Sequence, residues 1–141
     1  MSAVVPEAPT YLFVYGTLMS RARGALGASQ RARLGLKGTS LGAATIPGLL
    51  IDLGTYPGLL GPATPGDIVH GELFRLDLPD EVISGLDSYE GVSPQPTPHD
   101  EYARVSTSAR LESGEVVTAW VYRYRSTTSD FPVIPGGRWG D

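Results

Sequence analysis

Two neighbouring stretches of strand-like sequence near the C-terminal end place the strongest constraint on the fold. Tyr102 to Leu111 and Val116 to Tyr124 are rich in the β-branched and aromatic residues that strands favour. The four residues between them, Glu112-Ser-Gly-Glu115, have the composition of a tight turn. This pattern predicts an antiparallel hairpin, and with it a mainly antiparallel sheet.

Short elements are expected in the rest of the chain, because its 18 glycines and 12 prolines interrupt it too often for long helices. Further strands are expected at Tyr11 to Tyr15, at Ile68 to Leu76 and, one or two of them, within 39–53. Helices are expected at 80–90 and, from a less regular pattern, at 19–34, with loops at 55–66 and 92–100. Five to seven strands and one or two helices make an α+β domain around a curled or closed, mostly antiparallel sheet.

The length of 141 residues fits one domain, which we place at 11–125. Residues 1–10 are expected to form a flexible N-terminal arm, and residues 126–141 a loop-like tail. The arm carries neither basic residues nor an apolar run, and no later segment approaches the roughly 18 apolar residues of a spanning helix. We therefore expect a cytoplasmic protein that does not bind a membrane.

Composition and charge also narrow the partners and the chemistry. The net charge is −4, and the basic residues between Arg21 and Lys37 lack interleaved aromatic residues, so a nucleic-acid partner is not expected. The chain has no cysteine, which removes thiolate nucleophiles and cysteine-based metal sites. His70 and His99, 29 residues apart, do not make a metal site on their own, so no metal is expected. The oligomeric state stays open.

The expected helix at 80–90 places a carboxylate at the end of an apolar stripe. Val82, Ile83 and Leu86 have helical spacing, and Glu90 continues the same row four residues beyond Leu86. Gly91 then provides a helix stop. Burial and the negative end of the helix dipole both disfavour ionised Glu90, so its pKa should rise toward the range of a general base. The alternative is a glutamate that turns to solvent, which is the commoner fate of this residue type.

Two other motifs could carry chemistry. The strand at 11–15 meets Tyr15-Gly16-Thr17-Leu18, a turn whose successive backbone N–H groups could bind an anion, although a plain strand-ending turn is the simpler interpretation. Gly38-Thr-Ser40-Leu-Gly42 matches the serine hydrolase pattern, with His70 or His99 as its base. The surrounding sequence lacks the strand before and the helix after the serine, so this hydrolase is a distant third hypothesis.

Several segments together resemble one known family in order and rough spacing. They are Phe13-Val-Tyr-Gly-Thr-Leu18, Ile51-Asp-Leu-Gly-Thr-Tyr-Pro-Gly-Leu59, Val69-His-Gly-Glu-Leu-Phe74, Leu86-Asp-Ser-Tyr-Glu-Gly91, Tyr102-Ala-Arg-Val105 and Ala119-Trp-Val-Tyr122. From about residue 11 to 124 the chain resembles the gamma-glutamylcyclotransferase-like superfamily, especially its small gamma-glutamylamine cyclotransferase and plant avirulence-induced branch. The resemblance implies a small, mostly antiparallel β-barrel with one or two flanking helices.

The resemblance also implies a reaction and a site. The α-amine of a γ-glutamyl group would attack its own γ-carbonyl, releasing 5-oxoproline and a free amine without metal or cofactor. Glu90 stands at the position of the family's catalytic glutamate, as general acid and base. The small-molecule substrate would be bound by Tyr15, Gly16, Thr17 and Leu18. Tyr102, Arg104 and Tyr122 are further candidates for lining the pocket, and structural packing is the alternative role for each of them.

Asp87, three residues before Glu90, is expected to cap the helix or to face solvent. The alternative function, from a different class, is a non-catalytic binding or interaction protein that keeps the family's pocket without its activity.

Overall fold

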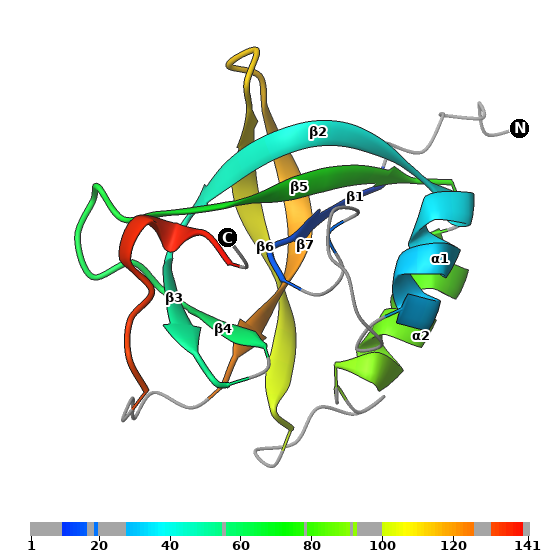
Figure 1. The fold of residues 1–141 in the computed structure, drawn as a ribbon. Coiled ribbons are helices and arrows are strands. Elements are labelled where there is room, and N and C mark those ends of the chain that lie inside the picture. The colour runs from blue at the N-terminus through cyan, green and yellow to red at the C-terminus, as the bar shows by residue number, and fades with distance from the viewer. Residues whose placement is uncertain are drawn as a thin grey trace, which may run out of the picture.

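Five strands close into a barrel in the order β1-β5-β2-β6-β7 (Figure 1). The computed structural model describes residues 10–16, 19, 28–54, 56–77, 79–90, 92, 100–125 and 131–139. The barrel strands are β1 (Thr10–Val14), β2 (Gly38–Pro47), β5 (Ile68–Leu76), β6 (Tyr102–Leu111) and β7 (Val116–Tyr124). Each neighbouring pair is antiparallel except β1 with β7, which runs parallel and closes the barrel. The expected small, mostly antiparallel barrel is confirmed.

Two helices lie side by side against one flank of the barrel (Figure 1). They are α1 (Ala28–Lys37) and α2 (Pro79–Tyr89). Helix α2 has the predicted position, whereas α1 lies later in the chain than the predicted 19–34, of which 20–27 fall outside the described residues. Gly35 is a poor helix former, so the sequence does not predict the last turn of α1. The buried Leu34 anchors that turn to the core.

A second, two-stranded sheet packs against the barrel strands β5 and β7. It pairs β3 (Leu49–Asp52) with β4 (Pro57–Leu60). The expectation of a continuous loop at 55–66 was therefore wrong. Pro57 can begin a strand, because the first strand position does not need the N–H that proline lacks. Leu59 is buried in the barrel core, which explains why this Pro-Gly segment forms a strand.

The core has two parts, one inside the barrel and one between the barrel and the helices. Strand β1 contributes to both, because Phe13 points into the barrel while Leu12 and Val14 pack toward the helices. All three side chains are buried. The turn that follows β1 therefore starts in the middle of the molecule, where a cavity can form.

The described part of the C-terminal tail runs along β3. Asp52 donates its backbone N–H to the Pro132 carbonyl (2.9 Å), and Ile134 donates to the Leu50 carbonyl (2.8 Å). A short 3₁₀ turn, η1 (Pro135–Gly137), follows, and Trp139 packs against both parts of the core. Among the residues described, no helix is both long and apolar enough to cross a bilayer.

Gly71 in β5 gives the clearest test of barrel packing. A Cβ at this position would lie 2.6 Å from Cζ of Phe13 and would also collide with the Val14 carbonyl. We expect Gly71→Ala to lower the free energy of unfolding by about 1–3 kcal/mol, because β1 and its core side chains must shift. Thermal and urea unfolding would measure the effect.

The matched control is Gly35→Ala, since nothing lies within 4 Å of a Cβ built at Gly35. It should instead stabilise the protein by roughly 0.5–1 kcal/mol through helix propensity. A Gly71→Ala protein as stable as the wild type would show that β1 and β5 are not packed as closely as described.

Candidate active site

A cavity of about 170 Å³ opens where the end of β1, the start of β4, the C-terminal end of α2 and the start of β6 meet. Its walls are Phe13, Val14, Tyr15, Gly16, Tyr56, Pro57, Tyr89, Glu90, Glu101, Tyr102 and Tyr122. Aromatic rings make up much of this surface, and the only charged groups among these wall residues are the two carboxyl groups. The cavity therefore combines an apolar wall with negative charge.

Glu90 lies directly after the last residue of α2. Its backbone N–H donates to the Leu86 carbonyl (2.8 Å), which keeps it on the row that starts at the buried Val82 and Leu86. The side chain is half-buried and lines the cavity. Burial, and secondarily the negative charge of Glu101, raise the pKa of Glu90 to about 7. The predicted rise of this pKa is confirmed, and the catalytic role of Glu90 stays a prediction.

Glu101 is a second cavity carboxylate that sequence reasoning missed. It directly precedes β6, is exposed, and accepts a hydrogen bond from the Tyr56 hydroxyl at Oε2 (2.7 Å). This hydrogen bond, together with burial, raises the pKa of Tyr56 to about 12, so the hydroxyl keeps its proton at neutral pH. The sequence contains one signal for Glu101, which is that it directly precedes Tyr102, a candidate pocket residue. A residue adjacent in the chain to a cavity residue lies close to the same cavity.

Three tyrosines use their hydroxyl groups to fix the cavity walls. Tyr15 donates to the carbonyl oxygen of Tyr122 (2.5 Å), and Tyr102 donates to that of Pro57 (2.8 Å). The hydroxyl of Tyr122 donates to Oδ1 of Asp87 (2.7 Å). Burial is the first cause that raises the pKa of all three, so they are neutral at physiological pH. Their rings line the cavity, and their hydroxyl groups form hydrogen bonds that fix the walls in place.

Asp87 faces Tyr122 and Arg104, so the expectation that it caps the helix or faces solvent was wrong. The same Oδ1 that accepts from Tyr122 also accepts from Nε of Arg104 (2.9 Å). The Arg104 guanidinium lies 4.4 Å from the ring centre of Trp120. Arg104 is not among the cavity walls, and it is linked to them through Asp87, which also binds the Tyr122 hydroxyl.

The turn after β1 is described in part. Tyr15 and Gly16 line the cavity, whereas Thr17 and Leu18 lie outside the described residues. Met19 donates its backbone N–H to the Gly16 carbonyl (3.1 Å). A Cβ on Gly16 would lie 2.9 Å from the ring of Pro57, so glycine allows the turn to touch the start of β4.

The two residues of the serine hydrolase hypothesis that the structure describes, Ser40 and His70, do not form its machinery. Ser40 lies within β2 instead of on a strand-to-helix turn, and its Oγ donates to Oε2 of Glu72 (2.6 Å). His70 lies in β5, where burial and the charge of Arg138 lower its pKa. His99 is outside the described residues. Within the described part of the chain, no three His, Asp or Glu side chains gather as metal ligands would.

Comparison with known protein families gives a match over most of the chain. A family model described as gamma-glutamyl cyclotransferase, AIG2-like, matches residues 12–141. The matched range includes every residue that lines the cavity. Among curated proteins, none gives a significant match.

Solved structures share the fold. An AIG2-like protein from Mus musculus superposes with a TM-score of 0.65 at 22% identity, over 88% of this chain and 82% of the mouse chain. A protein named gamma-glutamyl cyclotransferase gives 0.55 at 15% identity, over 89% and 70% of the two chains. YkqA from Bacillus subtilis gives 0.65 at 20% identity, and the match covers 94% of this chain but 40% of YkqA. At these identities the likeness establishes the fold alone.

Proposed function

Because the chain belongs to the gamma-glutamyl cyclotransferase, AIG2-like family, we propose that it releases 5-oxoproline and a free amine from a γ-glutamyl amine or a γ-glutamyl-acylated small molecule. The observation that carries this proposal is the carboxyl of Glu90, which faces an aromatic cavity with its pKa raised to about 7. A general base works best when its pKa lies near the working pH. Glu90 therefore takes the role of proton acceptor and donor.

The proposed reaction is an intramolecular aminolysis. Glu90 removes a proton from the substrate α-ammonium, and the freed amine attacks the γ-carbonyl carbon to close a five-membered ring. The bond between that carbon and the leaving nitrogen then breaks. In total, two protons leave the α-nitrogen and two arrive at the leaving amine, which Glu90 transfers one at a time, ending as a carboxylate. Holding amine and carbonyl together in the cavity supplies much of the rate.

The size of the cavity supports a small substrate group. Its volume of about 170 Å³ is below the roughly 300–1,000 Å³ of sites for drug-sized ligands. We place the γ-glutamyl group inside and let the leaving amine project outward. Backbone N–H groups of the Tyr15 to Leu18 turn are our candidates for binding the substrate α-carboxylate.

Release of 5-oxoproline, followed by mass spectrometry, tests the proposal. The substrates are γ-glutamyl dipeptides, γ-glutamyl-lysine, glutathione and simple γ-glutamyl amines. Release from one or more of them names the leaving group. Ligand-induced stabilisation without any 5-oxoproline would instead identify a binding protein that keeps the pocket.

The pH dependence of kcat/KM follows from the protonation of Glu90. The base must be ionised, and its pKa in the folded protein is about 7. We therefore expect kcat/KM to fall about tenfold per pH unit below pH 7. Rates measured from pH 5 to 9 on one substrate would show this limb, and a profile flat down to pH 5 would contradict the role of Glu90 as base.

A further inference from the structure

Two carboxylates from different parts of the fold face the same cavity. Glu90 comes from the end of α2, and Glu101 from the residue before β6. The Tyr56 hydroxyl donates to Glu101 (2.7 Å), which restricts where its carboxylate can lie. Because Tyr56 itself lines the cavity, this hydrogen bond belongs to the wall of the site.

We propose that Glu101 is a positioning residue for the reaction, whose fixed negative charge makes Glu90 a stronger base toward the substrate ammonium. The inference rests on the proposed function, in which Glu90 moves the protons. It adds a residue that touches neither reacting atom and acts through Glu90 alone.

Among the titratable groups around Glu90, Glu101 is the one whose negative charge acts on Glu90. The titratable groups near Glu90 come from every element at the cavity: Tyr15 after β1, Tyr56 before β4, Asp87 and Tyr89 in α2, Glu101 and Tyr102 at β6, and Tyr122 in β7. Tyr15, Tyr56, Tyr102 and Tyr122 have raised pKa values and are neutral. Asp87 is paired with the Arg104 cation.

Glu101 differs from Asp87 in its partner. Its hydrogen bond comes from a neutral hydroxyl, and no cation among the described residues forms an ion pair with it. A like charge disfavours ionised Glu90, and it is the second cause of the raised Glu90 pKa after burial. Substituting glutamine for Glu101 removes this charge but preserves the shape of the side chain.

Titration of Glu90 by NMR of ¹³C-labelled glutamate carboxyls tests the inference directly, with Glu90→Gln used to assign the signal. In Glu101→Gln the midpoint should move below that of the wild type, by on the order of 0.5 pH unit. Glu101→Asp keeps the charge and should restore most of the wild-type midpoint. Glu115→Gln makes the same change of charge at the turn that ends the hairpin, a full strand away, and should leave the midpoint in place.

The pH dependence of kcat/KM provides a second measurement of the same effect. The acid limb of kcat/KM in Glu101→Gln should move by the same interval as the midpoint, and its plateau should fall by about twofold as Glu90 becomes a weaker base. High salt should shrink the difference between Glu101→Gln and wild type, because the cavity mouth is exposed.

Two results would overturn the inference. One is a Glu90 midpoint that Glu101→Gln leaves unchanged or moves no more than Glu115→Gln does. The other is a rise in KM for substrates with a cationic leaving group while the midpoint stays fixed, which would make Glu101 a specificity residue. A wild-type protein that releases no 5-oxoproline would count against the proposed function, whereas the midpoint judges the effect of Glu101 without any turnover.

Discussion

The Glu90→Gln variant is expected to lose the release of 5-oxoproline by about 10²–10⁴-fold while it stays folded. Glutamine fills the same space between Leu86 and the cavity, but its amide cannot take a proton from the substrate ammonium. Binding of the γ-glutamyl group should survive, so kcat should fall far more than KM rises. Steady-state rates by mass spectrometry, at pH 8 where wild-type Glu90 is ionised, would measure the loss.

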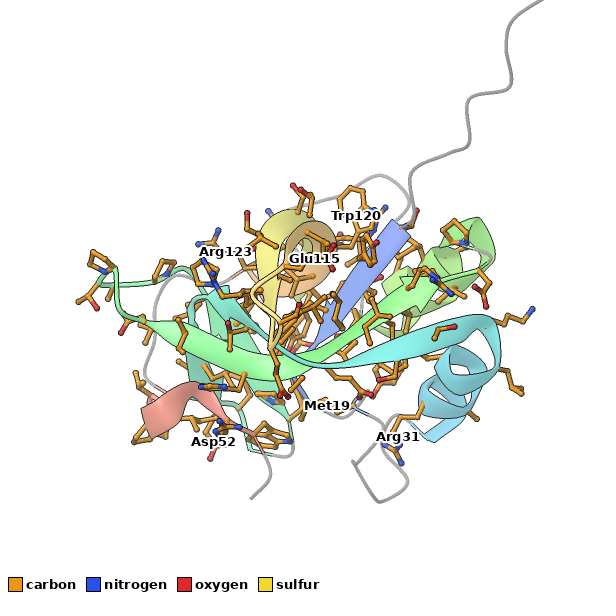
Figure 2. The ribbon with its side chains drawn as sticks, turned by 90° about the horizontal axis from the view of Figure 1, so that it is seen from above. Met19, Arg31, Asp52, Glu115, Trp120 and Arg123 are labelled. Atoms are coloured by element: carbon orange, nitrogen blue, oxygen red, sulfur yellow. The ribbon has the colours of Figure 1, made fainter. Side chains whose placement is uncertain are left out.

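The matched control is Glu115→Gln, the same substitution on an exposed side chain at the hairpin turn. This turn points toward the viewer in Figure 2, where Glu115 is labelled. It should retain wild-type rates. Turnover by a folded Glu90→Gln protein within a few-fold of wild type would exclude Glu90 as the proton carrier.

The same Glu90→Gln change is expected to stabilise the protein at alkaline pH. The pKa of Glu90 is about 7 in the folded protein and 4.5 for an ordinary glutamate. The contribution of Glu90 to the free energy of unfolding is therefore largest below pH 4.5 and is lost as the pH rises through 7. The reason is that the carboxyl ionises freely in the unfolded chain, whereas burial in the folded protein disfavours its ionised form. Above pH 7 the ionised side chain costs up to about 3 kcal/mol, which glutamine removes.

Melting temperatures of wild type and Glu90→Gln at pH 5 and pH 8 would test this trade between stability and activity. The gain should be small at pH 5 and about 5–10 °C at pH 8. Glu115→Gln controls for net charge and should show no such pH dependence. An equal gain at both pH values would mean that the ionisation of Glu90 carries no folding cost.

Local patterns were enough to predict the hairpin and helix α2. The predicted strands at 102–111 and 116–124 have the bounds of β6 and β7, because alternation and turn chemistry act within a few residues. Closure of the barrel is not local. Leu12 in β1 is opposite Phe74 in β5 and Trp120 in β7, and no sequence pattern links these residues. The count of short strands predicts a sheet that is curled or closed, and the family resemblance adds that it is a closed barrel.

Strand β4 shows why the loop expected at 55–66 went wrong. Pro57 and Gly58 have poor strand propensity, yet they pair with Asp52 and Ile51 of β3. A Cβ on Gly58 would approach the Tyr124 side chain to 3.2 Å, so the absence of a side chain allows β4 to lie against β7. Tertiary packing decided this segment against its local preference.

The candidate site also contains one residue that a local pattern predicts and others that no local pattern predicts. Glu90 could be singled out because the row from Val82 to Leu86 lies within one helix. Glu101 and Asp87 could not be assigned, because the groups that define them are contributed by Tyr56, Arg104 and Tyr122 from other elements. The sequence predicts a residue by its own element, and the electrostatics of a cavity depend on several elements at once.

The closure of the barrel also decides when during folding the cavity can exist. Its walls run from Phe13 to Tyr122, and the hydrogen bond from Tyr15 to Tyr122 joins residues 107 positions apart. Contacts this distant in sequence form late and slow the folding rate. A nascent chain must therefore expose β7 before β1 finds its second partner. The walls that bury Glu90 come from both ends of the chain, so we expect its raised pKa to accompany the closed barrel.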